Sequence, residues 1–325
     1  MKETEVLLEV EGVTKRYRRS TAPANTGVNL SVESGQVYGL LGHNGAGKTT
    51  LVNQIVGLIR PDCGSIRIDG RDVIADPGFA RRACSMQPQS HVPIDGLTPR
   101  QAIESLGRLR GGSREVVKAR TERLIEALDL GEWRDSDGGR LSGGVKRLVS
   151  FCMAAVEPGR IVILDEPTND VDPVRRRLLW GQVRSLANDG AAVLLVTHNV
   201  IEAERSVDRL AILDHGRVLT EGTPAELKAG IADELRLELV LDSDADAIEA
   251  QQFTGPHVVM GNRIVATVPT RLAGEAVTWA RDLRQTGRIE EFSLAPATLE
   301  DAYVALVGAT SVPDSTPEET DVRAA

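Results

Sequence analysis

The sequence has few cysteines and few aromatic residues, and it has no long hydrophobic run. Its three cysteines, Cys63, Cys84 and Cys152, are far apart and form no C-x-x-C pair, which argues against a disulfide framework or a cysteine zinc site and is typical of a reducing compartment. A bilayer-spanning helix needs about 20 consecutive apolar residues, and no stretch approaches that length. The N-terminus also lacks the basic head and apolar run of a signal peptide. We therefore expect a cytosolic chain that reaches a membrane only through a partner.

An excess of positive charge is missing as well. The 38 lysines and arginines are outnumbered by 47 aspartates and glutamates, which gives a net charge of -9 at pH 7. A broad field that attracts nucleic acid is therefore not expected, and neither is a nucleic-acid partner. Hydrophobic residues make up 41% of the chain and charged residues 26%, as in ordinary globular proteins. A chain of 325 residues exceeds one usual core, so we expect a large domain and a smaller one.

Short apolar segments alternate with helical periodicity in the first two thirds of the chain. The segments read "QVYGLLG", "RIVILDE", "AAVLLVTH" and "RLAILD". This alternation predicts a mostly parallel sheet flanked by helices, and we place this α/β domain at residues 1–229. Between about residues 98 and 157 the pattern is helical, so we expect a helical subdomain there. Its last helix has one apolar face, formed by Val145, Leu148, Val149, Cys152, Met153 and Val156.

The pattern changes after the α/β domain. The segment "ELRLELVLD" alternates leucine with polar residues as a strand does, and "RIVATVP" predicts another strand. Thr298 and Asp301 have the spacing of a capping box before a final apolar helix. We therefore expect a small α+β domain at residues 230–308. The polar, proline-containing remainder, residues 309–325, is predicted to be a disordered tail.

The clearest motif is a glycine-rich segment between an apolar strand and a helix expected to begin near Lys48. Residues 42–49 match G-x-x-x-x-G-K-[ST], the phosphate loop. The glycines let phosphate oxygens approach backbone N–H groups closely, and the helix N-terminus adds partial positive charge. Lys48 would neutralise the outer phosphates, and Thr49 would ligate Mg²⁺. The residues expected to contact ATP here are Gly42, His43, Asn44, Gly45, Ala46, Gly47, Lys48, Thr49 and Thr50.

A second motif, "RIVILDEPT", is an apolar strand that ends in two acids. An ion held by the phosphate loop needs a carboxylate on its other side, and Asp165 would hold Mg²⁺ through water. Glu166 would polarise the water that attacks the γ-phosphate. A solvated strand end is the alternative reading of this segment alone, and the phosphate loop earlier in the chain favours catalysis.

A third motif, "LSGGVKRL", opens the amphipathic helix described above. Free N–H groups and the Ser142 hydroxyl, together with Gly143 and Gly144, would form another anion site. Taken alone, the fragment fits a plain helix N-cap equally well.

Together and in this order, the motifs resemble those of the ATP-binding subunits of ATP-binding cassette (ABC) transporters. The phosphate loop "GHNGAGKTT", the signature-like "LSGGV", the strand "ILDEPT", the D-loop-like "NDVDP" and the histidine of "VTHN" each occur once. The resemblance implies a P-loop NTPase fold: a mostly parallel sheet with antiparallel strands, a helical subdomain, and here a small C-terminal α+β domain.

The resemblance also suggests roles for four further residues. Tyr17 resembles the aromatic residue that stacks on adenine, although a packed strand tyrosine is an equal reading. Gln89 resembles the glutamine that contacts Mg²⁺ and the attacking water, with Gln87 as the competing choice. His198 resembles the histidine that contacts the γ-phosphate, and a helix-capping histidine is its alternative. Asp172 resembles the D-loop acid that organises the opposing subunit.

The sequence departs from the family pattern at two places. Val145 stands where the family most often has glutamine, which puts the fit to a partner in question more than ATP binding. The tripeptide Asn169-Asp170-Val171 replaces the commoner Ser-Gly-Leu, and Asp170 adds a carboxylate near the expected site, which could slow turnover.

The resemblance implies a dimer in which Lys48 of one copy and Ser142 of the other bind the same ATP. It further implies the ATPase subunit of an exporter of a drug, antibiotic or lipid-like substrate, of the daunorubicin-resistance-like type. The partners would be a separately encoded transmembrane permease and a second ATP-binding subunit, in a homodimer at the cytoplasmic face of the membrane. The alternatives are an importer ATPase and a soluble ABC ATPase of repair or translation. The latter class would show a long heptad insertion or two cassettes in one chain, and neither feature is present.

Overall fold

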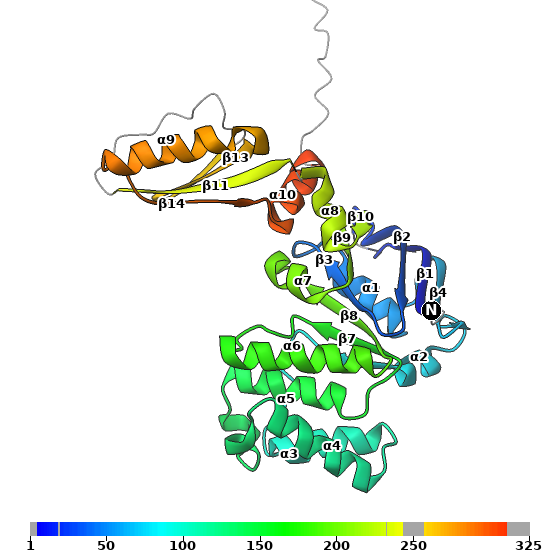
Figure 1. Ribbon diagram of the computed structural model, residues 1–325. Coiled ribbons are helices and arrows are strands. Elements are labelled where there is room, and N and C mark those ends of the chain that lie inside the picture. The colour runs from blue at the N-terminus through cyan, green and yellow to red at the C-terminus, as the bar shows by residue number, and fades with distance from the viewer. Residues whose placement is uncertain (1–4, 19, 232, 243–256, 311–325) are drawn as a thin grey trace, which may run out of the picture. The chain divides into compact units, whose positions relative to one another are not determined.

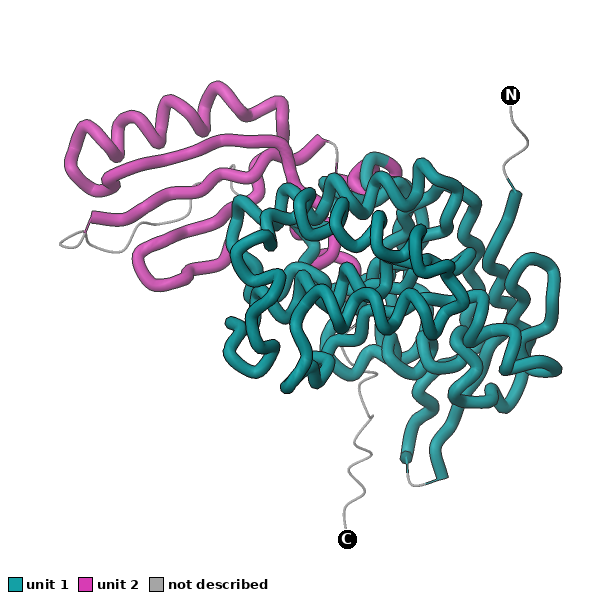
Figure 2. The backbone as a smooth tube through the Cα atoms, turned by 90° about the horizontal axis from the view of Figure 1, so that it is seen from below, with its two compact units in different colours: residues 1–225 teal, residues 226–325 magenta. Residues whose placement is uncertain are grey.

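The structure, a computed structural model, describes residues 5–18, 20–231, 233–242 and 257–310 (Figure 1). The chain forms two compact units, residues 1–225 and 226–325, which are described separately (Figure 2). The boundary proposed from the sequence lies four residues later. Most of the proposed tail, residues 311–325, lies outside the described residues, whereas residues 309 and 310 belong to the last helix.

The first unit is built on a six-stranded sheet in which only β9 and β10 pair in an antiparallel way. The strand order is β10-β9-β3-β8-β7-β6. The four apolar segments singled out in the sequence form β3, β7, β8 and β9, and they are buried almost throughout because helices cover both faces of a parallel sheet. The strands are β3 (Val37–Leu41), β6 (Cys84–Gln87), β7 (Ile161–Asp165), β8 (Ala192–Thr197), β9 (Arg209–Asp214) and β10 (Arg217–Gly222).

A second, antiparallel sheet of order β2-β1-β4-β5 belongs to the same unit. Leu8 and Ile66 from this sheet share one hydrophobic core with Leu40 and Leu194 from the six-stranded sheet, and Leu51 of helix α1 (Lys48–Ile55) contributes to it. Both sheets therefore support the helix that follows the phosphate loop. The strands are β1 (Val6–Lys15), β2 (Asn25–Glu33), β4 (Cys63–Ile68) and β5 (Arg71–Asp72).

Helices fill the region predicted to be helical, residues 98–157. Helix α3 (Pro99–Leu109) begins at a capping box formed by Thr98 and Gln101, and α4 (Arg114–Ala127) is capped by Ser113. In α5 (Gly143–Ala155) and the residue after it, the predicted apolar face is buried, apart from the half-buried Met153. The other helices of this unit are α2 (Pro77–Ala83), α6 (Pro173–Asn188) and α7 (Val200–Ser206), with 3-10 turns at Gly131–Trp133 and Gly138–Arg140.

The second unit is an antiparallel sheet of order β12-β13-β11-β14 with helix α9 on one face (Figures 1 and 2). Leu237 and Leu239 of the predicted leucine strand are buried against Ala276 and Ala280 of α9. The elements are β11 (Glu234–Leu241), β12 (His257–Met260), β13 (Arg263–Pro269), α9 (Ala273–Gln285), β14 (Ile289–Pro296) and α10 (Leu299–Thr310), with a 3-10 turn at Thr270–Leu272. Helix α8 (Pro224–Lys228) and a 3-10 turn at Ala229–Ile231 link the sheets of the two units in sequence.

The predicted capping box starts the last helix. The Thr298 amide donates to Asp301 Oδ2 at 2.8 Å, and the Asp301 amide donates to Thr298 Oγ1 at 3.3 Å. Among the residues that the structure describes, no helix is both long and apolar enough to cross a bilayer.

Candidate active site

The glycine-rich loop lies between β3 and α1, as the sequence predicts. Gly45 and Gly47 have φ angles of 89° and 104°, which side-chain-bearing residues rarely adopt. A Cβ on Gly47 would also lie 2.2 Å from the Ala24 carbonyl oxygen. Gly47 is the N-cap of α1 and offers no side chain to its amides, so the first N–H groups of the helix remain for an anionic ligand.

The Lys48 side chain packs back onto this loop. Its Nζ donates to the carbonyl oxygens of Gly42, at 2.6 Å, and His43, at 3.1 Å. The side chain is buried, and burial lowers the pKa of Lys48, whereas the nearby carboxylates Glu166 and Asp165 act to raise it. The loop thus holds the Lys48 ammonium group at the edge of a cavity of 430 Å³. The lining residues are Ala24, Asn44, Gly45, Gly47, Lys48, Thr49, Thr50, Gln89, Asp165 and Glu166.

Two adjacent carboxylates at the end of β7 complete this cavity. Asp165 is 5% exposed, and burial raises its pKa to about 6, with a further increase from Glu166 and an opposing effect of Lys48 and Arg147. Glu166 has a φ of 50°, a conformation unusual for this residue type, and its amide donates to the Val196 carbonyl at 2.9 Å. The turn therefore points two neighbouring acids into one cavity.

The turn after β8 fixes the carboxylate of Glu166. Thr197 Oγ1 donates to Glu166 Oε2 at 3.0 Å, and the His198 amide donates to Oε1 at 2.9 Å. His198 Nδ1 lies 2.5 Å from the same oxygen. Helix α7 is capped by Asn199 and not by His198, so the capping alternative for the histidine is wrong. This geometry suits a carboxylate that accepts a proton beside a histidine that orients it.

The two candidate glutamines have different surroundings. Gln87 is buried, and its Nε2 donates to the Arg147 carbonyl at 3.1 Å. Gln89 is exposed and lines the cavity. Of the two, only Gln89 therefore faces the space beside Asp165.

Arg147 is a positioning residue that the sequence reasoning missed. Its guanidinium donates to the carbonyl oxygens of Pro88, at 2.9 Å, and Gln89, at 2.7 Å, and it is only 4% exposed. Burial lowers its pKa, and the charges of Asp170 and Asp165 oppose that effect. Two adjacent basic residues, Lys146 and Arg147, follow "LSGGV", and they give no local signal of such a role, because most basic residues on helices are solvated.

Ser142 caps α5, and its Oγ accepts from the Val145 amide at 3.4 Å. A Cβ on Gly144 would lie 2.3 Å from the Asp170 carbonyl oxygen, so the turn packs tightly against the loop after β7. Val145, at the position where the family most often has glutamine, is buried. Ser142, Gly143 and Gly144 do not line the cavity of Lys48. Within one chain, the glycine-rich loop and the Ser142 turn therefore do not line a common cavity.

Two further candidates lie at the margins of the site. Asp172 caps α6, accepts from the amides of Val174 and Arg175 at 3.0 Å, and is exposed; these backbone hydrogen bonds and the Arg175 side chain lower its pKa. Tyr17 follows β1 and is 42% exposed, with its hydroxyl 3.4 Å from Thr50 Oγ1. An exposed ring beside the start of α1 is available for stacking.

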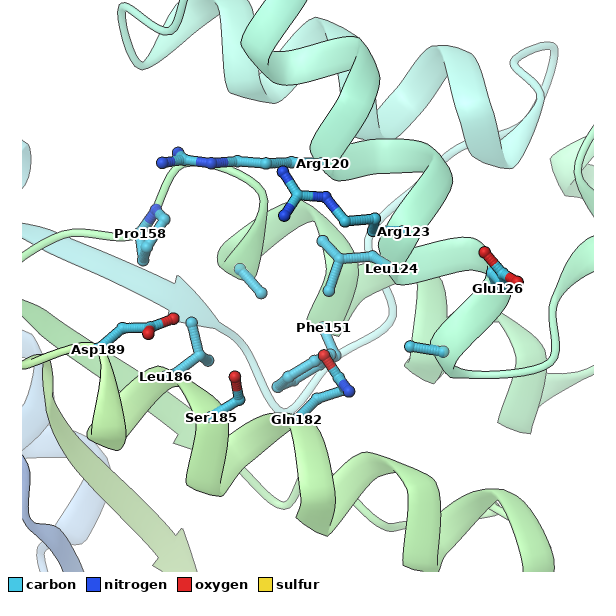
Figure 3. A pocket seen from close by; sticks show the side chains of 12 residues that line it. Arg120, Arg123, Leu124, Glu126, Phe151, Pro158, Gln182, Ser185, Leu186 and Asp189 are labelled. Atoms are coloured by element: carbon cyan, nitrogen blue, oxygen red, sulfur yellow. The ribbon is translucent and has the colours of Figure 1, made fainter.

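A larger cavity of 660 Å³ lies between α4, α5 and α6 (Figure 3). Arg120 and Arg123 lie on one side of it, and Gln182 and Ser185 of α6 lie on the other, with Asp189 just after that helix. The Arg120 guanidinium is paired with Glu157 at 2.6 Å. None of the predicted site residues lines this cavity, whereas Lys48, Asp165 and Glu166 line the smaller one.

Comparison with known proteins yields one family. The model of a family described as ABC transporter matches residues 25–169. The daunorubicin/doxorubicin resistance ATP-binding protein DrrA of Streptomyces peucetius is 34% identical over 317 residues, which cover 96% of this chain and 95% of that protein. Nod factor export ATP-binding protein I of Burkholderia lata is 33% identical, with 87% of this chain and 91% of that protein covered.

Solved structures agree with this assignment. The ATP binding subunit of an ABC transporter matches with a TM-score of 0.65 and 29% identity, over 69% of this chain and 93% of that chain. A dimeric ATP-binding cassette in a post-hydrolysis state, bound to ADP and Pi, matches with a TM-score of 0.61 and 25% identity, over 67% of this chain and 98% of that chain. The predicted α/β P-loop fold is confirmed. This chain therefore belongs to the ATP-binding subunits of ABC transporters, a family of ATPases that couple ATP hydrolysis to transport across a membrane.

Proposed function

We propose that this chain powers export of a drug, antibiotic or lipid-like substrate through a separately encoded transmembrane permease. The names of its relatives, which refer to drug resistance and Nod factor export, support an exporter over an importer. They equally argue against a soluble ATPase of repair or translation. The chain would then act at the cytoplasmic face of the membrane, where the permease holds it.

The phosphate loop would bind the triphosphate of ATP. The free amides at the start of α1 and the glycine-rich backbone would donate to phosphate oxygens, and Lys48 would exchange its contacts with the Gly42 and His43 carbonyls for the outer phosphates. Tyr17 would stack on the adenine, as its exposed ring beside Thr50 allows. The oxygen atoms of Thr49, Gln89 and Asp165 line one cavity and suit Mg²⁺, which prefers oxygen ligands. When bound, Mg²⁺ would neutralise charge that develops on the phosphates.

Glu166 would act as the general base for hydrolysis. Its carboxylate would accept a proton from water while the water oxygen forms a bond to the γ-phosphorus and the bond to the bridging oxygen of ADP breaks. Thr197 and the His198 amide would keep the carboxylate directed at that water. His198 would contact the γ-phosphate through its other ring nitrogen.

A second copy of the chain would complete each site. Ser142, Gly143 and Gly144 lie outside the Lys48 cavity, yet their turn presents helix N–H groups that suit a phosphate. In a homodimer, this turn would cover the ATP bound by the partner, and Asp172 would organise the opposing subunit. The dimeric cassettes among the similar structures support this arrangement.

The observation that carries the proposal is the carboxylate of Glu166, fixed by Thr197 and His198 in the cavity that Lys48 enters. Glu166→Gln should keep ATP binding and lower ATP turnover by about 10²–10⁴, the usual contribution of a general base. Lys48→Ala should abolish ATP binding. ATP hydrolysis and equilibrium ATP binding by the purified chain would be measured, with Glu132→Gln at an exposed position as a matched control. Parental turnover in Glu166→Gln would place the base elsewhere.

The transport part of the proposal needs its own measurement. The chain should co-purify with the permease and make drug efflux from vesicles depend on ATP. Efflux that is unaffected by Glu166→Gln would contradict coupling.

A further inference from the structure

Two histidines and one aspartate meet at the turn between β9 and β10, beside the phosphate loop. His43 Nε2 lies 2.9 Å from Asp214 Oδ1, and His215 Nε2 lies 3.9 Å from the same oxygen. One ligand atom from each of the three side chains lies within 4.8 Å of the others. Two imidazole nitrogens and a carboxylate oxygen are a frequent ligand set for zinc.

The backbone holds the two segments of this cluster together. A Cβ on Gly42 would lie 2.3 Å from the Leu213 carbonyl oxygen, so only glycine permits the close approach that places His43 beside Asp214. The Gly216 amide donates to the Ala46 carbonyl at 2.9 Å. The β9–β10 turn is therefore fixed to the phosphate loop on both sides of the cluster.

The hydrogen bonds of His43 leave a site for a cation. Its Nδ1 lies 2.7 Å from the Asn44 carbonyl oxygen, which can only accept, so Nδ1 carries the proton. In the neutral ring, Nε2 then presents a lone pair to Asp214, whose carboxylate also only accepts and is buried. Two acceptors 2.9 Å apart require a second proton or a metal ion between them. A ring that donates its other N–H to a carbonyl is the usual state of a metal-bound histidine.

We propose that His43, Asp214 and His215 bind a zinc ion that is linked to the nucleotide site. Ligand atoms of a tetrahedral zinc lie about 3.3 Å apart. To bind zinc, the distance between His43 Nε2 and Asp214 Oδ1 must increase slightly from 2.9 Å, and the distance between His215 Nε2 and the same oxygen must decrease from 3.9 Å. The His215 side chain is 83% exposed, so it can rotate, and solvent can supply the fourth ligand. His215 has a φ of 44° and Gly216 has a φ of 77°, as a two-residue hairpin turn requires.

The link to the nucleotide site rests on the proposed function. The His43 carbonyl accepts from Lys48 Nζ. A zinc ion that fixes His43 therefore also restrains the loop that holds the Lys48 ammonium group. A divalent charge next to the loop further favours the triphosphate. Zinc should therefore tighten nucleotide binding, and the nucleotide should tighten zinc binding by the same factor, which is about 5-fold or more for a typical coupling.

The first experiment measures zinc binding to the full chain in competition with a chromogenic chelator, without nucleotide. The parent and His257→Ala, a control at an exposed histidine of the second unit, should bind one zinc ion with equal affinity. His43→Ala and His215→Ala should bind about 10-fold or more weakly, because each loses a ligand. Equal affinity in all four proteins, or no zinc binding by the parent, would overturn the site. Because no nucleotide is present, this result does not depend on whether the chain hydrolyses ATP.

The second experiment measures affinity for a non-hydrolysable ATP analogue at saturating Mg²⁺, with and without zinc. Zinc should tighten binding in the parent and have no effect in His215→Ala, which leaves the phosphate loop intact. The same zinc effect in both proteins, or no effect in either, would overturn the link between the two sites.

Discussion

At the residue scale, Asp165 is a carboxylate that folding buries against its preference for water. Its pKa lies at about 6 in the folded chain and at 3.8 in the unfolded reference. Below pH 3.8 the group is neutral in both states and does not affect the free energy of unfolding. As the pH rises from 3.8 to about 6, the unfolded chain loses this proton first, so the folded state loses stability. Above that range the loss is complete and amounts to about 3 kcal/mol.

Asp165→Asn should therefore stabilise the nucleotide-free chain at neutral pH by up to about 3 kcal/mol, because the amide carries no charge to bury. The gain should shrink as the pH falls from about 6 to 3.8. Denaturant unfolding of parent and variant across this range measures it. A gain that is independent of pH would show that the ionised carboxylate is not the cause. The same variant should lose Mg²⁺-dependent hydrolysis.

Arg147 joins the helix of the "LSGGV" turn to the backbone of Gln89. Arg147→Met should lower the free energy of unfolding by about 2–3 kcal/mol, because two part-buried carbonyl groups lose a charged donor. Arg147→Lys should restore little, since an ammonium cannot match the fork that spans both carbonyls. Lys146→Met, next to it in the sequence, is the control and should cost less than about 1 kcal/mol. Denaturant unfolding distinguishes them, and equal effects at the two positions would contradict the role of Arg147.

At the element scale, the sequence predicts two kinds of strand: β11 and β13, in which apolar and polar residues alternate, and β3, β7, β8 and β9, which have unbroken apolar runs. Burial on both faces requires such runs, so the signal is strong. The short strand β12 leaves Val258, Val259 and Met260 exposed, and no alternation marks it. The motifs of the site could be predicted because each is contiguous in the sequence. Arg147 could not, because its partners are backbone carbonyls distant in sequence.

In the turn that starts α5, Gly144 leaves less room for a Cβ than Gly143 does. Gly144→Ala would bring a Cβ to 2.3 Å from the Asp170 carbonyl oxygen, so the backbone of α5 or of the loop must shift. The nearest atom to a Cβ on Gly143 is a side-chain oxygen at 3.5 Å, an ordinary contact. We expect Gly144→Ala to destabilise the chain by about 1–3 kcal/mol and Gly143→Ala by less, as measured by thermal unfolding. Equal destabilisation would show that the contact with Asp170 is not limiting.

At the scale of the whole molecule, the proposed homodimer would take one half of each of its two sites from each chain. Ser142→Arg should prevent nucleotide-dependent dimerisation, because a long cationic side chain blocks the turn that covers the partner's ATP. Binding of ATP by the isolated chain should be unchanged, since Ser142 does not line the Lys48 cavity. Light scattering with ATP in the Glu166→Gln background measures the dimer. A dimer of normal stability in the double variant would contradict the shared site.

The position of Glu166 has a consequence for when the chain hydrolyses ATP. Three contacts already direct its carboxylate within a single chain, so the proposed base would itself impose no delay. In the proposed dimer, the encounter of two chains would limit hydrolysis, because the serine-glycine turn comes from the second copy. The rate of ATP hydrolysis per chain should therefore rise with protein concentration. A chain that no permease brings next to a second copy should hydrolyse ATP slowly. Futile nucleotide consumption is thereby limited without any dedicated inhibitor.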